Sequence, residues 1–524
     1  MESLTPPDNI YQRGRLKLYP VLLTYLKLRP AIGNKHHGRE DSRPPHPGAR
    51  GRCIYCLKTR GHLRQTPAIP IPPRPRLPQP KPRYYPQSLP GNPRDSHQTG
   101  SFGTIPRAVQ AAQRSYQDQA EARPDIFIRY DFPKLLDQSR AAVASLLRAP
   151  VDTIVFVCNA TVAVNTVLKS LAWNPDGKDE ILYFSTVYSG CGKTIDCVVD
   201  FSTGLASSRE VPITYPIEDD EILSRFRAAA QASRDAGKRP RIALYDTVSS
   251  LPGVRFPFEA MTAACRDLGI LSLLDGAQGA GLIDIDLAQL DPDFFLTNCH
   301  KWLHCPRGCA AFYVPLRNQD LVRSSLATSH GYVSRGGTQR FNPLPPAEGK
   351  SRFVNEFEFV GTMDNSPYLA VKDAIAWRES IGGEEKIIQW QTNLAKAGGK
   401  KVAEILGTEV LDNKTGTLTN CGMVNVALPM VIVDDDAAGK GKVDDKGCLG
   451  VPRKAAYPLT QWMLETMIGE YDTFIALIVH QGRWWARLSA QVYLDMDDFE
   501  WAGQTLKALC KRAASLEMVT GSGA

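Results

Sequence analysis

From about residue 101 onward, short apolar segments alternate with amphipathic ones, and this alternation predicts the fold class. Apolar runs rich in β-branched residues indicate buried strands, and apolar positions three or four residues apart indicate helices. The predicted strands are Thr153–Cys158, Ile181–Ser185, Arg241–Asp246, Ile270–Leu274 and Cys309–Val314. The predicted helices among them are Ala160–Leu171, Asp219–Ala236 and Phe258–Leu268. Such a chain forms an α/β domain whose mostly parallel sheet carries helices on both faces.

The pattern changes near Gly361, where longer helices and fewer strands predict a smaller α+β domain. The predicted helices are Tyr368–Ile381, Glu384–Leu406 and Leu459–Tyr471, and the predicted strands are Val424–Val433 and Trp484–Tyr493. The segment Asp434–Pro452 is rich in Gly, Lys and Asp and is predicted to be an exposed loop. We therefore expect a large domain over residues 96–345 and a small C-terminal domain over residues 346–524.

Composition sets residues 1–95 apart from the rest of the chain. They contain 18 Lys and Arg residues but 5 Asp and Glu residues, and 18 of the 38 prolines. Such a segment buries too little apolar surface to offset the entropy of ordering, so we predict a disordered tail. An organelle-targeting leader, a proline-rich partner-binding segment and a misassigned start of the coding region remain alternatives. Cys53, Cys56 and His62 resemble half of a zinc site, but no second ligand pair follows, so no metal is predicted.

The overall composition excludes several protein classes. No apolar run reaches the ~18 residues that span a bilayer, and the N-terminus lacks the plan of a secretory signal. The 12 cysteines are scattered over 524 residues, unlike those of a small disulfide scaffold. We expect a cytoplasmic protein with reduced thiols and with neither a membrane nor a nucleic acid as its partner.

Polar residues that follow the predicted strands are the first candidates for chemistry. In parallel sheets a ligand lies beyond the carboxyl ends of the strands, where Asn159, Tyr188, Ser249 and Asp275 are expected. Asp275 precedes Lys301 by 26 residues. Pyridoxal phosphate chemistry needs both groups, because a lysine amine binds the cofactor's aldehyde and a carboxylate keeps its pyridine nitrogen protonated.

At this point the sequence resembles the class V aminotransferase family of pyridoxal phosphate enzymes. The matching words are Asp-Gly-Ala-Gln at 275–278, Asn-Cys-His-Lys-Trp at 298–302, Val-Gly-Thr-Met-Asp at 360–364 and Arg-Leu-Ser at 487–489. The resemblance covers about residues 100–520. It is strongest to the isopenicillin N epimerase-like branch, which includes the fungal C–S lyase of ergothioneine synthesis. It implies the fold type I of pyridoxal phosphate-dependent transferases.

The resemblance assigns roles around the cofactor ring. Lys301 would hold pyridoxal phosphate covalently and then act as the proton-transfer base. Asp275 would pair with the pyridine nitrogen, and Gln278 would contact the phenolic oxygen, with Ser249 a weaker candidate beside it. Tyr188 would stack over the ring and, in the C–S lyase branch, donate a proton to the leaving group.

The resemblance also implies a phosphate pocket. Asn159, Ala160 and Thr161 lie between a predicted strand and a predicted helix, where backbone N–H groups can hold an anion. Asn298 and His300 would complete this pocket.

Two further assignments concern the substrate and the partner subunit. Arg487 matches the arginine that binds the α-carboxylate of an amino-acid substrate, a contact for which a bidentate guanidinium is suited. Gly361 and Thr362 match a segment that reaches the phosphate of the neighbouring subunit, which implies a homodimer.

The sequence departs from the family pattern in two places. The family has an apolar strand and an Asn-His pair before the segment Ser101–Gly103, whereas residues 95–100 are polar here. The loop 434–452 contains Cys448, and a mobile-loop cysteine is the persulfide acceptor in cysteine desulfurases.

Three functions follow as hypotheses. The first is a C–S lyase that cleaves a cysteine-conjugate sulfoxide such as hercynylcysteine sulfoxide to a thiol or sulfenate, pyruvate and ammonia. The second keeps the cofactor but changes the reaction to amino-acid epimerisation, or to desulfuration through Cys448. The third is a non-enzymatic binding protein built on an enzyme fold, against which the set of Asp275, Lys301 and Arg487 argues.

Overall fold

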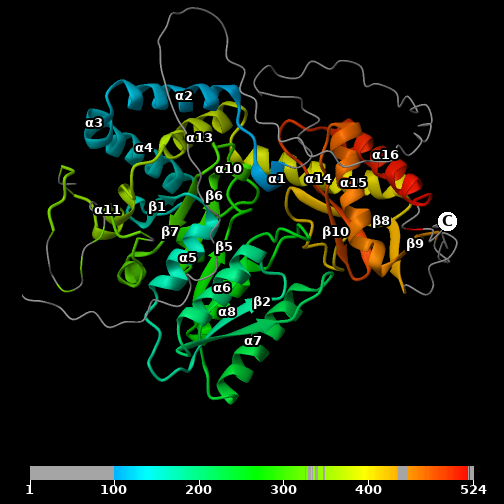
Figure 1. Cartoon of the computed structure of the whole chain (residues 1–524), viewed down its shortest axis with the longest axis horizontal. Coiled ribbons are helices and arrows are strands. Elements are labelled where there is room, and N and C mark those ends of the chain that lie inside the picture. Colours follow the sequence, from blue (N-terminus) through cyan, green and yellow to red (C-terminus); the bar gives the residue numbers. More distant parts are fainter. Residues whose placement is uncertain are drawn as a thin grey trace, which may run out of the picture. The chain divides into compact units, whose positions relative to one another are not determined.

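The computed structural model describes residues 99–324, 349–434 and 447–516, together with 326–328, 332, 334, 336, 340–345 and 519. The predicted tail 1–95, the half zinc site at Cys53, Cys56 and His62, and residues 435–446 of the predicted loop lie outside the described residues. All described residues belong to one compact unit, which contains two β-sheets (Figure 1).

The first sheet has seven strands in the order β1-β7-β6-β5-β4-β2-β3. The strands are β1 (Ile154–Val157), β2 (Asp179–Phe184), β3 (Ala206–Val211), β4 (Arg239–Asp246), β5 (Leu271–Asp275), β6 (Phe294–Asn298) and β7 (Ala310–Tyr313). All neighbouring pairs are parallel except those that β7 makes with β6 and β1. The prediction of a mostly parallel α/β sheet is confirmed.

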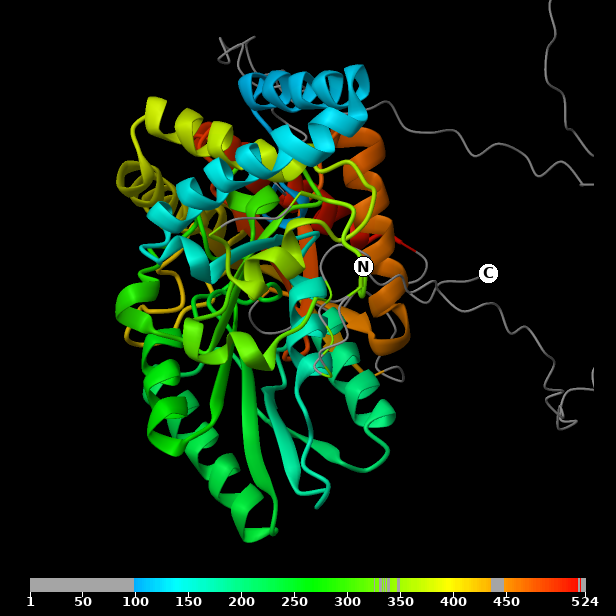
Figure 2. The same cartoon turned by 90° about the vertical axis from the view of Figure 1, so that its left-hand side faces the viewer.

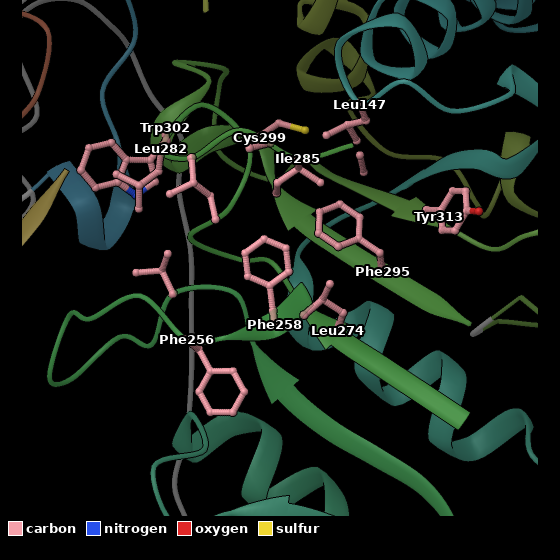
Figure 3. Packing of buried hydrophobic residues seen from close by; sticks show 14 of the residues in the cluster. Leu147, Phe256, Phe258, Leu274, Leu282, Ile285, Phe295, Cys299, Trp302 and Tyr313 are labelled. Atoms are coloured by element: carbon pink, nitrogen blue, oxygen red, sulfur yellow. The ribbon is translucent and has the colours of Figure 1, made fainter. Parts of the chain in front are cut away.

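Helices cover both faces of this sheet, as the nearly continuous burial along β1, β2, β5, β6 and β7 requires. On one face, Leu273 of β5 and Phe294 of β6 pack with α5 (Ala160–Ser170), α6 (Ser189–Phe201) and α11 (Arg352–Glu358). On the other, Leu274 and Phe295 point to a second cluster, whose packing Figure 3 shows around Phe258 and Ile285. The helices on that second face are α2 (Arg107–Ala122), α4 (Phe132–Leu146), α7 (Asp219–Asp235), α8 (Phe258–Leu268), α12 (Ser366–Leu369) and α13 (Val371–Ser380).

The second sheet has four strands in the order β10-β11-β8-β9. The strands are β8 (Met423–Val433), β9 (Leu449–Pro452), β10 (Ala476–His480) and β11 (Arg483–Ser489). They pack with α14 (Glu384–Leu406), α15 (Ala456–Tyr471) and α16 (Met496–Ala513), which Figure 1 labels beside them. In Figure 2 the first sheet and its helices face the viewer, and this second part lies behind them. This is the smaller α+β part that the sequence predicts. The domain boundary between residues 345 and 346 remains a prediction.

Short elements complete the chain. The α-helical ones are α1 (Thr99–Phe102), α3 (Pro124–Ile126), α9 (Leu287–Leu290) and α10 (Cys299–Trp302). The others are the π-helix η2 (Phe127–Asp131) and the 3-10 helices η3 (Val151–Thr153), η4 (Leu316–Leu321) and η6 (Arg453–Ala455).

The prediction that all of Asp434–Pro452 is an exposed loop is wrong at its C-terminal end. Leu449–Pro452 is the strand β9, which pairs in parallel with β8, and its four residues are buried. Cys448 directly precedes this strand and is also buried. Leu449 and Val451 of β9 pack in the core of the second sheet, although the sequence just before them is rich in Gly, Lys and Asp.

Among the described residues, no helix has both the length and the apolar composition that crossing a bilayer needs.

Candidate active site

The carboxyl ends of β4 and β5 bring the predicted chemistry together. Asp275 is the last residue of β5 and is 4% exposed. Its Oδ1 accepts a hydrogen bond from the backbone N–H of Ala277 at 2.8 Å, and its Oδ2 accepts one from the thiol of Cys191 at 3.3 Å. Burial raises the pKa of Asp275, while these two donors and the charge of Lys301 oppose the rise. The carboxylate is thus fixed in direction before any ligand binds.

Lys301 lies in the short helix α10, and its side chain is within electrostatic range of Asp275. Burial lowers the pKa of Lys301 to about 8, Asp275 works against this shift, and Arg487 adds to it. An amine with this pKa is partly neutral near physiological pH, which the reaction with an aldehyde requires.

Three contacts hold residues 299–307, which comprise α10 with Lys301 and the turn after it and are called the lysine loop below. The indole N–H of Trp302 donates to Oε1 of Gln278 at 2.7 Å. The backbone of Gly103 packs on His300 so closely that a Cβ there would lie 1.5 Å from the His300 carbonyl oxygen. The Gly103 carbonyl in turn accepts a hydrogen bond from Arg307. Gly103 therefore contacts the lysine loop, although residues 95–100 just before it depart from the family pattern.

Gln278 presents an unused donor. Its side chain is 2% exposed, and its Nε2 has no hydrogen-bond partner among the described residues. A buried amide N–H without a partner costs free energy, so an acceptor is expected there. The phenolic oxygen of pyridoxal phosphate is such an acceptor.

The N-terminus of α5 forms the predicted phosphate cradle. Asn159 caps this helix by accepting from the N–H of Val162, and Asn298 accepts from the N–H of Ala160, both at 2.9 Å. The N–H of Ala163 also has a partner, so among the first-turn N–H groups that of Thr161 has no partner in the described part of the chain, and Thr161 adds a hydroxyl. An anion at this position would meet both groups of Thr161 and the positive end of the helix dipole.

His300 is held in one tautomer. Its Nδ1 lies 3.1 Å from the Cys309 carbonyl oxygen, which only accepts, so Nδ1 carries the proton. Burial lowers the pKa of His300, and the neutral ring leaves Nε2 as an acceptor.

Tyr188 lies at the N-terminus of α6, and its side chain is 50% exposed. A Cβ on Gly190 would lie 2.9 Å from the Tyr188 ring and 3.6 Å from the Thr161 hydroxyl, so Tyr188 is a neighbour of the phosphate cradle. A large aromatic side chain left uncovered beside these polar groups is suited to stack on a planar ligand.

Three predicted site residues, Ser249, Gly361 and Thr362, form no hydrogen bond with the site residues described above. Ser249 is buried and donates its hydroxyl proton to the Pro252 carbonyl at 2.7 Å, so it holds its own turn. Gly361 and Thr362 lie in the loop between α11 and α12, and they form no hydrogen bond with the described residues of this chain. Their predicted contacts with the cofactor remain predictions.

Arg487 is a fully enclosed cation in β11. It is 2% exposed, and its Nη1 donates to the Ser250 carbonyl at 2.6 Å and its Nη2 to the Ser101 hydroxyl at 2.7 Å. Its Nε has no partner, and no carboxylate of the described residues pairs with it. Burial lowers the pKa of Arg487 to about 10. This guanidinium is prepared to receive an anion.

Sequence reasoning missed three residues of the site. Asp246 ends β4 beside Asp275, Cys191 donates to Asp275, and Ser101 holds Arg487. The position of Asp246 at the end of a predicted strand was the signal that could have identified it.

The polar groups of this site fit pyridoxal phosphate. A lysine amine, a buried carboxylate, the unpartnered amide N–H of Gln278 and the N–H and hydroxyl of Thr161 lie around one region, each with the polarity that one part of this cofactor needs.

Comparisons with known proteins agree with this geometry. A family model described as "Aminotransferase class-V" matches residues 102–438. The chain is 35% identical over 431 residues to the L-cysteine desulfhydrase-like protein lolT1 of Epichloe uncinata, with 80% of this chain and 93% of that protein covered. It is 31% identical over 411 residues to the hercynylcysteine sulfoxide lyase of Schizosaccharomyces pombe, with 78% and 93% covered. Among solved structures, the cystine C–S lyase C-DES in complex with cysteine persulfide is similar in fold, with a TM-score of 0.58, 17% identity and 80% and 96% of the chains covered.

Proposed function

Since the chain belongs to the class V aminotransferase family of pyridoxal phosphate enzymes, we propose that it is a C–S lyase that cleaves a cysteine-conjugate sulfoxide. The products would be pyruvate, ammonia and a thiol or sulfenate. The substrate class is that of hercynylcysteine sulfoxide, which would place the reaction in ergothioneine synthesis. Both relatives described above are named for reactions on cysteine or a cysteine derivative, and they support this proposal.

Arg487 supports an amino-acid substrate most strongly, because it is buried and has no anionic partner among the described residues. A buried guanidinium without an anion is unfavourable, and a carboxylate with bidentate geometry removes this penalty. Arg487 also lowers the pKa of Lys301, so the two groups are close enough to act on one small molecule. An α-carboxylate on Arg487 therefore orients the bonds at Cα relative to Lys301.

The protein's own groups then have separate tasks. Pyridoxal phosphate, when bound, supplies an electron sink for the substrate's Cα. Lys301 would hold it and then remove the Cα proton, for which a pKa of about 8 suits an amine near neutral pH. Asp275 would keep the pyridine nitrogen protonated. Tyr188, exposed at the mouth of the site, would donate its phenolic proton to the departing sulfur.

The alternatives use the same cofactor. An amino-acid epimerase needs a second acid to return a proton to the opposite face of Cα, whereas a lyase needs one near the sulfur. A desulfurase needs a cysteine that can reach the substrate. Cys448 is buried at the start of β9, which favours a packing role for this thiol over that of an acceptor.

Pyruvate release tests the proposal. The purified enzyme is supplied with hercynylcysteine sulfoxide, with cysteine and with an enantiopure amino acid, and pyruvate and optical rotation are followed. We expect the sulfoxide to give pyruvate fastest. The Tyr188→Phe variant should slow this step at least about tenfold, because a positioned general acid contributes ~10²–10⁴-fold. Racemisation without pyruvate would establish the epimerase instead, and equal rates for Tyr188→Phe would remove the phenol from the mechanism.

The assembly and location belong to the same proposal. We propose a homodimer in which the exposed Thr362 and its neighbour Gly361 reach the phosphate of the other subunit. We also propose a cytoplasmic location, which the scattered cysteines of the sequence support.

A further inference from the structure

Two carboxyl groups, not one, lie side by side under the site. Asp246 ends β4 and Asp275 ends β5, and the two residues are direct partners in the register of these parallel strands. Neighbouring strands lie about 4.8 Å apart, and partners in register point to the same face of the sheet. The two carboxyl groups are thus close neighbours on one face.

The two carboxyl groups differ in their hydrogen bonds. Asp275 accepts from the N–H of Ala277 and from the thiol of Cys191, and both donors stabilise its charged form. The side chain of Asp246 has no hydrogen bond and no ion pair with any described residue. If only one of the two is ionised, these contacts place the charge on Asp275 and the proton on Asp246.

The surroundings support a single charge. Burial raises the pKa of Asp246, and the neighbouring Asp275 raises it further. The other titratable groups that face Asp246 are Lys301, Cys191 and Tyr215. Lys301 is the only cation among them. Asp275 is buried and Asp246 is half-buried, so two negative charges on these neighbouring positions would repel each other with little screening by water.

We propose that Asp246 is a neutral carboxylic acid beside an ionised Asp275, so that the pair carries one negative charge, which lies on Asp275. By staying neutral, Asp246 leaves Asp275 as the single negative charge of the pair, which on the proposed function would pair with the pyridine nitrogen of the cofactor. A second consequence concerns Lys301. An ionised Asp246 would raise the pKa of this amine, so the proton on Asp246 keeps Lys301 reactive at lower pH.

Infrared spectroscopy of the apoprotein tests the proton directly. At neutral pH the wild-type spectrum should contain the C=O stretching band of a protonated carboxylic acid, and this band should shift when aspartate is labelled with ¹³C. The band should be lost in Asp246→Asn. It should persist in Asp196→Asn, a control with the same chemical change on the exposed face of α6. A wild-type spectrum without such a band at neutral pH would overturn the proposal, even if the variant fails to fold.

The reactivity of Lys301 gives an independent measurement. The rate at which added pyridoxal phosphate combines with the apoprotein is followed against pH. Because asparagine is neutral like the proposed acid, Asp246→Asn should leave the pH midpoint of this rate unchanged. A midpoint that falls clearly in Asp246→Asn would show that Asp246 is ionised in the wild-type protein, which contradicts the proposal.

Discussion

Two arginines enclosed in the same part of the molecule differ in what surrounds them. Arg378 is 0% exposed and Arg487 is 2% exposed. Arg378 pairs with the carboxylate of Glu384 and donates to the carbonyls of Trp302 and Gly281, at 2.7 and 3.1 Å. Arg487 reaches only neutral oxygens and keeps one N–H without a partner. The first cation is compensated and connects α13 and α14 to the lysine loop, whereas the second is left open for a ligand.

Burial alone does not distinguish a structural arginine from a binding one, because both have left water. The distinguishing quantity is the charge that remains uncompensated when all donors of the guanidinium have been assigned.

The largest expected effect on folding is that of Arg378→Met. Loss of this guanidinium leaves the carbonyls of Trp302 and Gly281 without their donor and Glu384 without its partner. Breaking a buried pair costs about 3–5 kcal/mol, so the free energy of unfolding should fall by about that amount. Urea denaturation of the apoprotein measures it. A fall of the same size in Arg487→Met would mean that the two arginines do not differ as described.

The largest expected effect on binding is that of Arg487→Lys. An ammonium keeps the charge but loses the bidentate geometry, and a lost contact to a buried charged group costs about 2–5 kcal/mol. We expect kcat/KM for the amino-acid substrate to fall on the order of 10²-fold or more. Steady-state kinetics measures this, and the unfolding midpoint of the same variant should stay close to that of the wild type. Unchanged kinetics would assign the α-carboxylate to another residue.

The two arginines should also differ in their effect on the pKa of Lys301. Burial lowers the pKa of Lys301 from 10.5 to about 8, and Arg487 contributes to this lowering. The rate at which pyridoxal phosphate combines with the apoprotein should rise with pH as the amine loses its proton, and the midpoint of this rise should lie at about pH 8. Arg487→Met should move this midpoint upward because it removes a nearby positive charge. Arg378→Met, measured at a temperature where it remains folded, should not move it.

The smallest expected effect is that of Ser101→Ala. The Ser101 hydroxyl accepts from Arg487 at 2.7 Å, and the loss of one such hydrogen bond costs about 1 kcal/mol. KM should rise by about fivefold while kcat changes little, since the guanidinium keeps its contact with Ser250. A larger fall in kcat than rise in KM would show that the segment before residue 104 acts on the reaction step itself.

Much of the fold and the centre of the site could be predicted because their signals are local. The helix Phe258–Leu268 matches its prediction at both ends, as does Glu384–Leu406, since each has regular apolar spacing and ends at a glycine. Asp275 and Lys301 were identifiable because the motifs around them are contiguous in sequence. The strands β3 and β6 were missed. β3 lies at the sheet edge with partly exposed polar residues in its middle, so it lacks an apolar run.

The remaining site residues depend on register and on distant contacts. Asp246 becomes a candidate only when β4 is paired in register with β5, which one sequence does not encode in any short pattern. Ser101 and Arg487 meet across 386 positions. The four residues of β9 are strand because β8 lies beside them, and their own composition is that of a loop.

The contact of Ser101 with Arg487 also has a consequence for biosynthesis. A ribosome makes Ser101 long before it makes Arg487, so these two residues cannot meet until most of the chain has been synthesised. Contacts so distant in sequence form late because a large loop must first be closed. The nascent protein can therefore assemble its first sheet early, but it becomes able to recognise an amino acid only after β11, the last strand before α16, has been made.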